Sequence, residues 1–264
     1  MKKVRLDQRV FELGFTESRE RAKTTVMSGI VFVNGQRADK PGMPVDPDAD
    51  IEVRGVALPF VSRGGFKLDK ALKVFPIDPA GKTCIDCGAS TGGFTDVLLQ
   101  HGAAKVYAVD VGYGQLAWKL RNDERVINLE RTNLRYVTEE QIPELLDIAV
   151  MDVSFISVKL VLPAVQRLLK PDADIVCLIK PQFEAGREEV GKKGVVRDSA
   201  VHKEVICSVL DFAPGIGLTP VGLDFSPIKG PEGNIEYICH LKNGDFAAPQ
   251  LDVDAVVAAS HEAL

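Results

Sequence analysis

The sequence lacks the features of membrane-spanning, secreted and fibrous proteins. No apolar run approaches the roughly 18 to 20 residues of a membrane-spanning helix, because even the apolar stretch 148–162 contains Asp152 and Lys159. The N-terminus starts with basic residues but has no uninterrupted apolar core behind them, so a secretory signal is not expected. The 23 Gly and 15 Pro form no low-complexity segment. With 45% hydrophobic and 26% charged residues, the composition is that of an ordinary globular protein.

Cysteine is scarce, with five residues in the chain. An odd number in a protein of this size favours reduced thiols and a cytoplasmic location. Cys84 and Cys87 form a C-x-x-C, but no second pair completes a zinc site, and their segment resembles a strand rather than the helix start of a redox motif. We therefore expect no bound metal, and cysteines that pack as small apolar side chains.

Basic residues are slightly outnumbered, since 32 Lys+Arg stand against 37 Asp+Glu. The imbalance is uneven: residues 1–70 carry a net charge of +3, and the remainder carries −8. Arg19, Arg21 and Lys23 fall in one predicted helix, with Arg5 upstream. Charge alone does not distinguish an RNA-binding surface from a solvated helix face.

The length of 264 residues suits two domains. Helical spacing is found over 5–15, which Gly14 can end, and again up to Ser28 with Thr16 as the expected N-cap. Short strands are expected at 30–33, followed by an Asn34-Gly35 turn, and at 50–53. We predict an α+β domain over 1–54, a linker over 55–61 and a second domain over 62–264.

From residue 82, short apolar strands alternate with helices, which is typical of a doubly wound α/β domain with a mostly parallel sheet. Ligands of such sheets bind at the carboxyl ends of the strands. The expected strands are 82–86, 105–110, 125–129, 147–151, 174–180, 217–224 and 234–241, and the expected helices include 93–101, 156–169 and 198–212.

A glycine-rich turn follows the first of these strands, in the string DCGASTGGF from Asp86 to Phe94. Such a turn lets a ligand approach the backbone closely. Asp110 ends the next strand, where a carboxylate can accept hydrogen bonds from ribose hydroxyls. The glycine spacing is not G-x-G-x-x-G, which disfavours a dinucleotide cofactor and hence a dehydrogenase. These features predict an adenosine-containing ligand.

Four charged residues are candidates for one site. Asp152 follows the fourth strand and Lys180 ends the fifth, so both lie at carboxyl ends. If the last strand runs antiparallel beside the fifth, Glu236 returns to the same edge. Lys67 precedes the first α/β unit, and the sequence does not place it. Any one of them alone is most simply a surface ion-pair partner, whereas convergence of all four favours function.

Residues 4–53 resemble an S4-type RNA-binding domain. The matching positions include Ser18-Arg19, Val33-Asn34-Gly35 and Pro41-Gly42. The resemblance implies that the second helix and its basic side chains meet RNA backbone, a contact that does not reveal the RNA sequence. The RNA-binding residues that it implies here are Arg5, Arg19, Arg21 and Lys23.

The remainder resembles a class I S-adenosylmethionine-dependent methyltransferase, whose first two motifs match DCGASTGGFTD and VDVGYGQL. With SRGGFKL, MDVSFIS, IKPQFEAGREEVGKKGVVRD and SPIKGPEGNIEY, nearly the whole chain is similar to the TlyA/haemolysin A family, which joins an S4-like module to a domain related to FtsJ-type RNA 2′-O-methyltransferases. The resemblance implies a Rossmann-like fold with a seven-stranded sheet, S-adenosylmethionine as cofactor, and ribosomal RNA or ribosomal subunits as partner. Cofactor-binding residues are then expected to be Asp86, Gly88, Ala89, Ser90, Gly92, Gly93, Phe94, Asp110, Asn133 and Asp152.

By the same resemblance, four residues match the Lys-Asp-Lys-Glu tetrad of those enzymes: Lys67, Asp152, Lys180 and Glu236. A ribose hydroxyl must lose its proton as it attacks the sulfonium methyl in line, and Lys180 would accept or steer that proton. Asp152 would orient Lys180 and the hydroxyl, while Lys67 and Glu236 hold the substrate. The reaction needs no metal.

Further RNA contacts are expected after Lys180. Phe183 is a candidate for contact with a base, whereas Phe94 and Phe155 more simply belong to the core. The Gly- and charge-rich segment 185–197 is expected to be a mobile loop over the site. Its Lys192 and Lys193 either grip phosphate or are merely solvated.

The favoured hypothesis is an rRNA 2′-O-methyltransferase, with cytidine in either ribosomal subunit as the target that the family implies. One alternative is an S4-anchored RNA-binding or ribosome-assembly factor with little catalysis, which would not need the four charged residues. Another is the haemolysin-type activity of the family name. Direct pore formation is disfavoured by the absence of a spanning segment.

Overall fold

The computed structural model describes residues 3–16, 18–54, 59–191 and 193–264. Their contacts form two compact units, Met1–Gly65 and Phe66–Leu264. Most of the predicted linker (55–58) and the predicted RNA contact Lys192 lie outside the described residues. The domain boundaries inferred from the sequence stay predictions.

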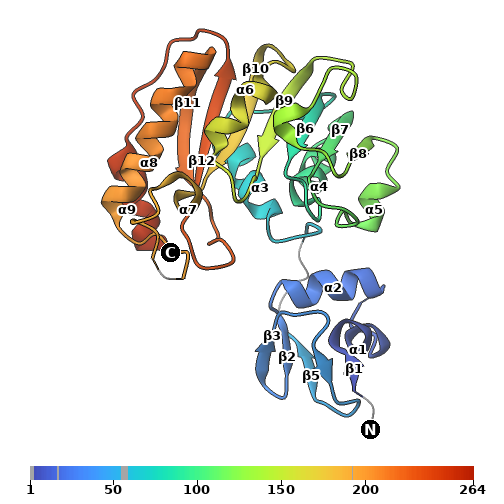
Figure 1. Cartoon of the computed structure of the whole chain (residues 1–264). Coiled ribbons are helices and arrows are strands. Elements are labelled where there is room, and N and C mark those ends of the chain that lie inside the picture. Colours follow the sequence, from blue (N-terminus) through green and yellow to red (C-terminus); the bar gives the residue numbers. More distant parts are fainter. Residues whose placement is uncertain (1–2, 17, 55–58, 192) are drawn as a thin grey trace. The chain divides into compact units, whose positions relative to one another are not determined.

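The N-terminal unit packs two helices against short strands (Figure 1). Its core consists of small and branched side chains that include Leu6, Val10, Ala22, Val26 and Val31, all fully buried. The elements are β1 (Val4–Arg5), α1 (Leu6–Glu12), α2 (Arg19–Met27), β2 (Val31–Val33), β3 (Gln36–Ala38), β4 (Pro44–Val45) and β5 (Ile51–Val53). Strands β3, β2 and β5 form one antiparallel sheet, and β1 pairs with β4.

Two local predictions in this unit have different outcomes. Asn34 and Gly35 have φ angles of 50° and 77°, the left-handed conformation of a tight hairpin turn, as the pair predicts. Thr16 was the wrong N-cap for α2. Ser18 caps it instead, because its hydroxyl accepts a hydrogen bond from the backbone N–H of Arg21 at 3.1 Å.

The C-terminal unit contains the predicted seven-stranded sheet, in the order β11-β12-β10-β9-β6-β7-β8. Strands β6 to β10 are mutually parallel, and β12 runs antiparallel to both β10 and β11. The strands are β6 (Thr83–Cys87), β7 (Lys105–Val109), β8 (Val126–Leu129), β9 (Leu146–Met151), β10 (Leu169–Ile179), β11 (Leu218–Phe225) and β12 (Tyr237–Asn243). Every predicted strand is confirmed, including the antiparallel last one.

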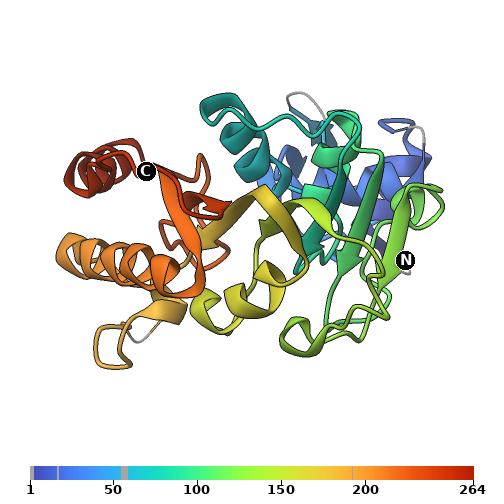
Figure 2. The same ribbon diagram turned by 90° about the horizontal axis from the view of Figure 1, so that it is seen from above.

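Helices cover both faces of this sheet. Figure 2 shows α3 on one face and α6 and α8 on the other. The helices are α3 (Gly65–Val74), α4 (Gly93–Gln100), α5 (Trp118–Arg121), α6 (Leu162–Gln166), α7 (Pro181–Glu184), α8 (Ser199–Phe212) and α9 (Val253–Ala263), with short 3-10 turns η1 (Leu134–Tyr136), η2 (Val158–Leu160) and η3 (Ala213–Ile216). Among the described residues, none of these helices is both long and apolar enough to cross a membrane.

Two element boundaries differ from the sequence prediction. The helix expected over 156–169 is divided into η2 and α6, because Pro163 has no N–H to donate and is suited only to the first turn of α6. Strand β10 begins at Leu169 rather than at 174: Leu169 pairs with Leu146, and the polar residues that follow form an irregularity before Asp174 pairs with Ile148. The start of β10 was missed because the polar residues after Leu169 do not show the apolar pattern of a buried strand.

Candidate active site

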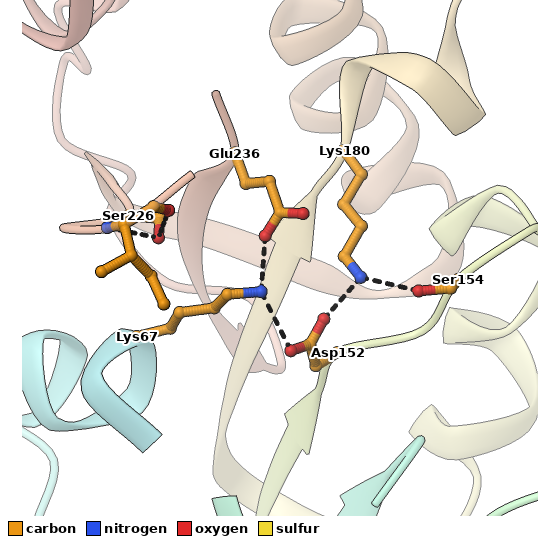
Figure 3. Close-up of polar contacts among 7 residues, drawn as sticks. Lys67, Asp152, Ser154, Lys180, Ser226 and Glu236 are labelled. Atoms are coloured by element: carbon orange, nitrogen blue, oxygen red, sulfur yellow. Dashed lines mark hydrogen bonds and ion pairs between the residues drawn. The ribbon is translucent and has the colours of Figure 1, made fainter. Parts of the chain in front are cut away.

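Lys67, Asp152, Lys180 and Glu236 lie together in one cluster of ion pairs (Figure 3). The Lys67 Nζ donates to Glu236 Oε2 at 2.6 Å and to Asp152 Oδ2 at 3.1 Å. The other oxygen of Asp152 is 2.5 Å from Lys180 Nζ. Asp152 therefore bridges two ammonium groups, and Lys67 bridges two carboxylates.

The sheet explains why three of these residues meet. Asp152 follows β9 and Lys180 follows β10, so the parallel register leaves both at the carboxyl edge. Ile179 pairs with Tyr237 in the antiparallel β10–β12 ladder, which puts Glu236 beside Lys180 at that edge. The fourth residue, Lys67, comes from the first turns of α3, which brings its side chain from outside the sheet.

The electrostatics of the cluster differ from those of a surface ion pair. The side chains of Lys67 and Glu236 are 7% and 1% exposed. Burial disfavours the charge of Lys67, but Asp152 and Glu236 outweigh it and raise the pKa of this lysine. Burial likewise opposes the charge of Asp152, and the two lysines outweigh it and lower its pKa. Lys67 is therefore held as a cation, which makes it a poor proton acceptor.

Lys180 has a second partner that the sequence did not predict. Its Nζ donates to the Ser154 hydroxyl at 2.9 Å, in addition to its ion pair with Asp152. Ser154 is exposed, and it comes two residues after Asp152 on the segment that leaves β9. The one sequence signal for this contact is that Ser154 belongs to the MDVSFIS motif, and the motif by itself does not indicate that the serine binds Lys180.

A cavity of about 440 Å³ adjoins the cluster, and Asp152 and Ser154 belong to its wall. Of the predicted cofactor residues, Gly88, Ser90, Asp110, Asn133 and Asp152 line it. Its volume lies within the range of small-molecule sites. The lining residues that sequence reasoning missed are Val111, Gln115, Leu134, Arg135, Val153, Ser154, Phe155, Ile156 and Val161.

Asp110 is held in place within this wall by backbone donors. The N–H of Ser90 donates to one carboxylate oxygen at 2.8 Å, and the N–H of Gly112 donates to the other at 2.6 Å. Each oxygen keeps a further lone pair with which it can accept a hydrogen bond from a ribose hydroxyl. Asn133, which also lines the cavity, accepts from the Arg135 N–H through its side-chain oxygen, and its amide nitrogen remains a donor. This donor and acceptor set fits an adenosine moiety.

The glycines of the turn are required mainly by the protein's own packing. A Cβ at Gly88 would lie 2.9 Å from the carbonyl oxygen of Asp152, and one at Gly92 would lie 2.2 Å from Leu120 Cδ1. Both residues also have positive φ angles, of 86° and 94°. The sequence prediction attributed the glycines to close approach of a ligand. At Gly88 the absent side chain instead makes room for the backbone of Asp152 at the end of β9.

The remaining predicted cofactor residues do not line the cavity. Phe94 is 3% exposed and Gly93 is buried, both in the first turn of α4. Ala89 is buried, and its carbonyl accepts from the Gly92 N–H. Asp86 is 1% exposed and accepts two hydrogen bonds from Thr95 on Oδ2, while its Oδ1 has no partner among the described residues. Burial raises the pKa of Asp86 to about 7.

Two phenylalanines lie beside Lys180. Phe155 and Phe183 have ring centroids 5.2 Å apart, and Lys180 Nζ is 5.9 Å from the Phe183 ring. The expectation that Phe155 belongs to the core was wrong, because Phe155 is 91% exposed. The chain leaves β9 there in a left-handed conformation, with φ of 63° at Phe155, and this turns the ring outward.

Two of the three predicted RNA-binding arginines of the N-terminal unit, Arg5 and Arg19, share a buried anion. The Arg5 guanidinium donates to both oxygens of Asp7, at 3.0 and 2.8 Å, and Arg19 lies 3.8 Å from the same carboxylate. Asp7 itself is fully buried. The side chains of Arg5 and Arg19 remain 50% exposed, and Lys23 is exposed on α2. Asp7 therefore fixes the direction of two cations that still face outward.

The end of segment 185–197 is anchored rather than loose. Val196 is 2% exposed; its N–H donates to the Asn234 side chain at 3.0 Å and its carbonyl accepts from His202 Nε2 at 3.1 Å. Lys193 and Arg197, on either side, are exposed. Asn234 also donates to the Gly194 carbonyl, so the segment is tied to the chain that enters the active site at Glu236.

Gly230 offers a test of the geometry around Glu236. A Cβ at this glycine would lie 2.7 Å from Glu236 Oε1, so Gly230→Ala requires the buried carboxylate, whose other oxygen binds Lys67, or its surroundings to shift. We expect the rate of methyl transfer to fall by roughly 10- to 100-fold with unchanged cofactor affinity. Displacement of a catalytic side chain by about 1 Å has an effect of this size. Steady-state kinetics and titration calorimetry measure the two quantities. The control is Gly215→Ala, whose Cβ meets nothing within 4 Å; equal rates in both variants would contradict the role of Glu236.

Known proteins contain the same combination of domains. The FtsJ-like methyltransferase family model matches residues 60–243, and the S4 domain model matches residues 4–51. The "Putative rRNA methyltransferase YqxC" of Bacillus subtilis is 50% identical over 270 residues, covering 100% of this chain and 96% of that protein. The "16S/23S rRNA (cytidine-2'-O)-methyltransferase TlyA" of Mycobacterium tuberculosis is 47% identical over 242 residues, covering 91% and 90%. A solved "Putative hemolysin from Streptococcus thermophilus" has a TM-score of 0.79 at 48% identity, covering 100% and 97%.

The strand order, the cavity at the carboxyl edge and the adjoining ion-pair cluster define the class of Rossmann-like methyltransferases, here with an S4 domain at the N-terminus. The chain belongs to the FtsJ-like methyltransferase family, in the branch whose members are named TlyA and hemolysin A. It is thus an enzyme of the methyltransferase type, as the motifs predicted.

Proposed function

We propose that this protein transfers the methyl group of S-adenosylmethionine to the 2′-hydroxyl of a ribose in ribosomal RNA, with cytidine as the target nucleoside. One observation carries the proposal: Asp152 belongs both to the wall of the cavity and to the Lys67–Lys180–Glu236 ion-pair cluster. A methyl donor in the cavity and a hydroxyl at the cluster would therefore meet. The name of the Mycobacterium tuberculosis relative supports the choice of substrate. An rRNA substrate places the proposed activity in the cytoplasm.

The cofactor would be held by the residues that fit it. Asp110 would accept hydrogen bonds from the ribose hydroxyls, Asn133 would face the adenine, and the backbone at Gly88 and Ser90 would border the rest. Bound S-adenosylmethionine supplies a sulfonium-activated methyl group. Because the donor is already activated, positioning of the hydroxyl contributes much of the rate.

The chain's own residues then handle the proton. The Nζ of Lys180 contacts Asp152 and Ser154 (Figure 3), both of which line the cavity. After giving up its own proton to solvent, Lys180 would act as the neutral amine: it would steer the 2′-hydroxyl into line and accept its proton as the new carbon–oxygen bond forms and the carbon–sulfur bond breaks. Asp152 fixes the direction of Lys180. Lys67, which its carboxylate neighbours keep charged, would hold Asp152 and Glu236 in position rather than exchange a proton.

The direct test is transfer of a radiolabelled methyl group from S-adenosylmethionine to naked rRNA and to separated ribosomal subunits. A 2′-O-methyl group blocks alkaline cleavage of the following phosphodiester, so labelled dinucleotides that resist hydrolysis would identify the modified oxygen. Label on a base, released as an ordinary mononucleotide, would contradict ribose methylation. Cofactor binding without transfer to any RNA would favour the alternative of an assembly factor with little catalysis.

The S4 unit is expected to supply RNA affinity rather than chemistry. The double substitution Arg21→Ala/Lys23→Ala should weaken RNA binding and flatten its salt dependence, because each lost phosphate contact removes about one counterion from the salt slope. Cofactor affinity should not change. Filter binding at several salt concentrations measures the effect. The control Lys82→Ala/Lys170→Ala removes equal charge from the C-terminal unit, at the amino ends of β6 and β10. Equal losses in both double variants would contradict a local RNA surface on α2.

A further inference from the structure

Glu184 joins two catalytic segments without contacting the reacting groups. It ends α7, the short helix that directly follows Lys180. Its Oε2 accepts from the Ser157 hydroxyl at 2.7 Å, and its Oε1 accepts from the Val158 N–H at 2.6 Å. Both partners lie at the far end of the segment that begins with Asp152. The carboxylate therefore ties the strand end of β9 to that of β10.

The tie lies beyond two other contacts between the same segments. Nearest the sheet, Lys180 contacts Asp152 and Ser154; further out, the rings of Phe155 and Phe183 pack at 5.2 Å. Glu184 makes the contact that is farthest along both segments, with Ser157 and Val158. Among the described residues, Ser157 and Val158 donate a hydrogen bond to no other carboxylate. Glu184 is therefore the one carboxylate that holds the far end of the segment.

The segment needs such a constraint. Phe155 has φ of 63°, a left-handed conformation that costs a residue with a Cβ roughly 1 kcal/mol or more, and the residue as a whole is 91% exposed. An exposed, strained loop of this kind relaxes unless its ends are held. Asp152 holds the near end through its ion pairs, and Glu184 holds the far end.

We propose that Glu184 is a positioning residue that sets Phe155 and Ser154 against Phe183 and Lys180, and so presents the RNA nucleoside to be methylated. The proposal rests on the proposed RNA methyl transfer. It assigns Glu184 no proton and no contact with cofactor; the side chain acts only through the geometry of the two segments.

Three substitutions separate geometry from charge. Glu184→Gln keeps an acceptor for the Val158 N–H and can donate to the Ser157 hydroxyl, so it should retain kcat/KM for RNA within about threefold. Glu184→Ala removes both hydrogen bonds and should lower kcat/KM by roughly 10- to 100-fold, through a higher KM for RNA as well as a lower kcat. Adding Ser157→Ala to Glu184→Ala should lower kcat/KM little further, because the hydrogen bond that the two side chains share is already lost and only the Ser157 cap on the Lys159 N–H goes with it.

The matched control is Glu144→Ala, which removes a carboxylate that bonds Lys105 and Tyr107 elsewhere in the unit. Its kinetics should equal those of the wild type. Thermal unfolding of each variant shows whether a loss of activity follows a loss of fold. The inference is overturned if Glu184→Ala keeps wild-type kinetics, if Glu184→Gln falls as far as Glu184→Ala, or if the activity loss matches the unfolded fraction. Wild-type protein that labels no RNA overturns the proposed function, and this inference with it.

Discussion

Lys180→Ala is expected to abolish methyl transfer, with a loss of at least about a thousandfold, while S-adenosylmethionine still binds. Lys180 contacts both Asp152 and the exposed Ser154, so its loss removes the group that is proposed, as the neutral amine, to accept the proton. General acid–base groups contribute about 10² to 10⁴ in rate. Lys180 does not line the cavity that is proposed to hold the cofactor, which is why binding should persist.

Single-turnover transfer of labelled methyl, with excess enzyme over rRNA, measures this loss without interference from product release. Titration calorimetry with S-adenosylhomocysteine measures cofactor affinity. Lys159→Ala is the matched control: its ammonium bonds the Ser208 hydroxyl and lies outside the cluster. Full activity in Lys180→Ala would eliminate the mechanism proposed above.

Asp152→Asn is expected to reduce both stability and activity. The substitution leaves the ammonium groups of Lys67 and Lys180 facing a neutral amide in a buried site. Removing one partner of a buried ion pair typically costs about 3 kcal/mol or more of unfolding free energy. Methyl transfer should fall with it, because Lys180 loses the group that orients it.

The stability loss should depend on pH in a defined direction. The folded protein holds the pKa of Asp152 below its ordinary value of 3.8, so its contribution is complete above that pH and is lost as the pH falls through the folded value. The difference in unfolding free energy between wild type and variant should therefore be large at pH 7 and should shrink below pH 3.8. Urea denaturation of wild type and variant at pH 7 and at a pH below 3.8 tests this expectation. A difference that does not change with pH would mean that Asp152 acts by packing rather than by charge.

Local sequence patterns were sufficient for most of the fold. The alternation of apolar strands and helices predicted all seven strands, and the Asn34-Gly35 pair predicted its turn. These features depend on side-chain periodicity and on backbone preferences of single residues, which are visible without knowledge of distant contacts. The prediction failed where one residue type opposed the surrounding pattern. Pro163 divides a segment with helical spacing, and polar residues interrupt the apolar pattern at the start of β10.

The candidate site was only partly predictable, for the same reason. Asp152, Lys180 and Glu236 could be placed at one edge because strand direction and order determine where strand ends lie. Ser154 and Glu184 have no such topological signal. Their roles depend on the path of an irregular segment after β9, including the outward turn at Phe155.

The sequence by itself therefore determined the class of fold, the methyltransferase motifs and the identity of the charged residues at the strand ends. Only the tertiary structure decided that Lys67 reaches Asp152 and Glu236, which are 85 and 169 residues away along the chain. It also decided that Gly88 makes room for the backbone at Asp152 rather than for a ligand alone. Periodicity records which side of an element faces the core, whereas contacts between remote segments arise only once the elements have packed.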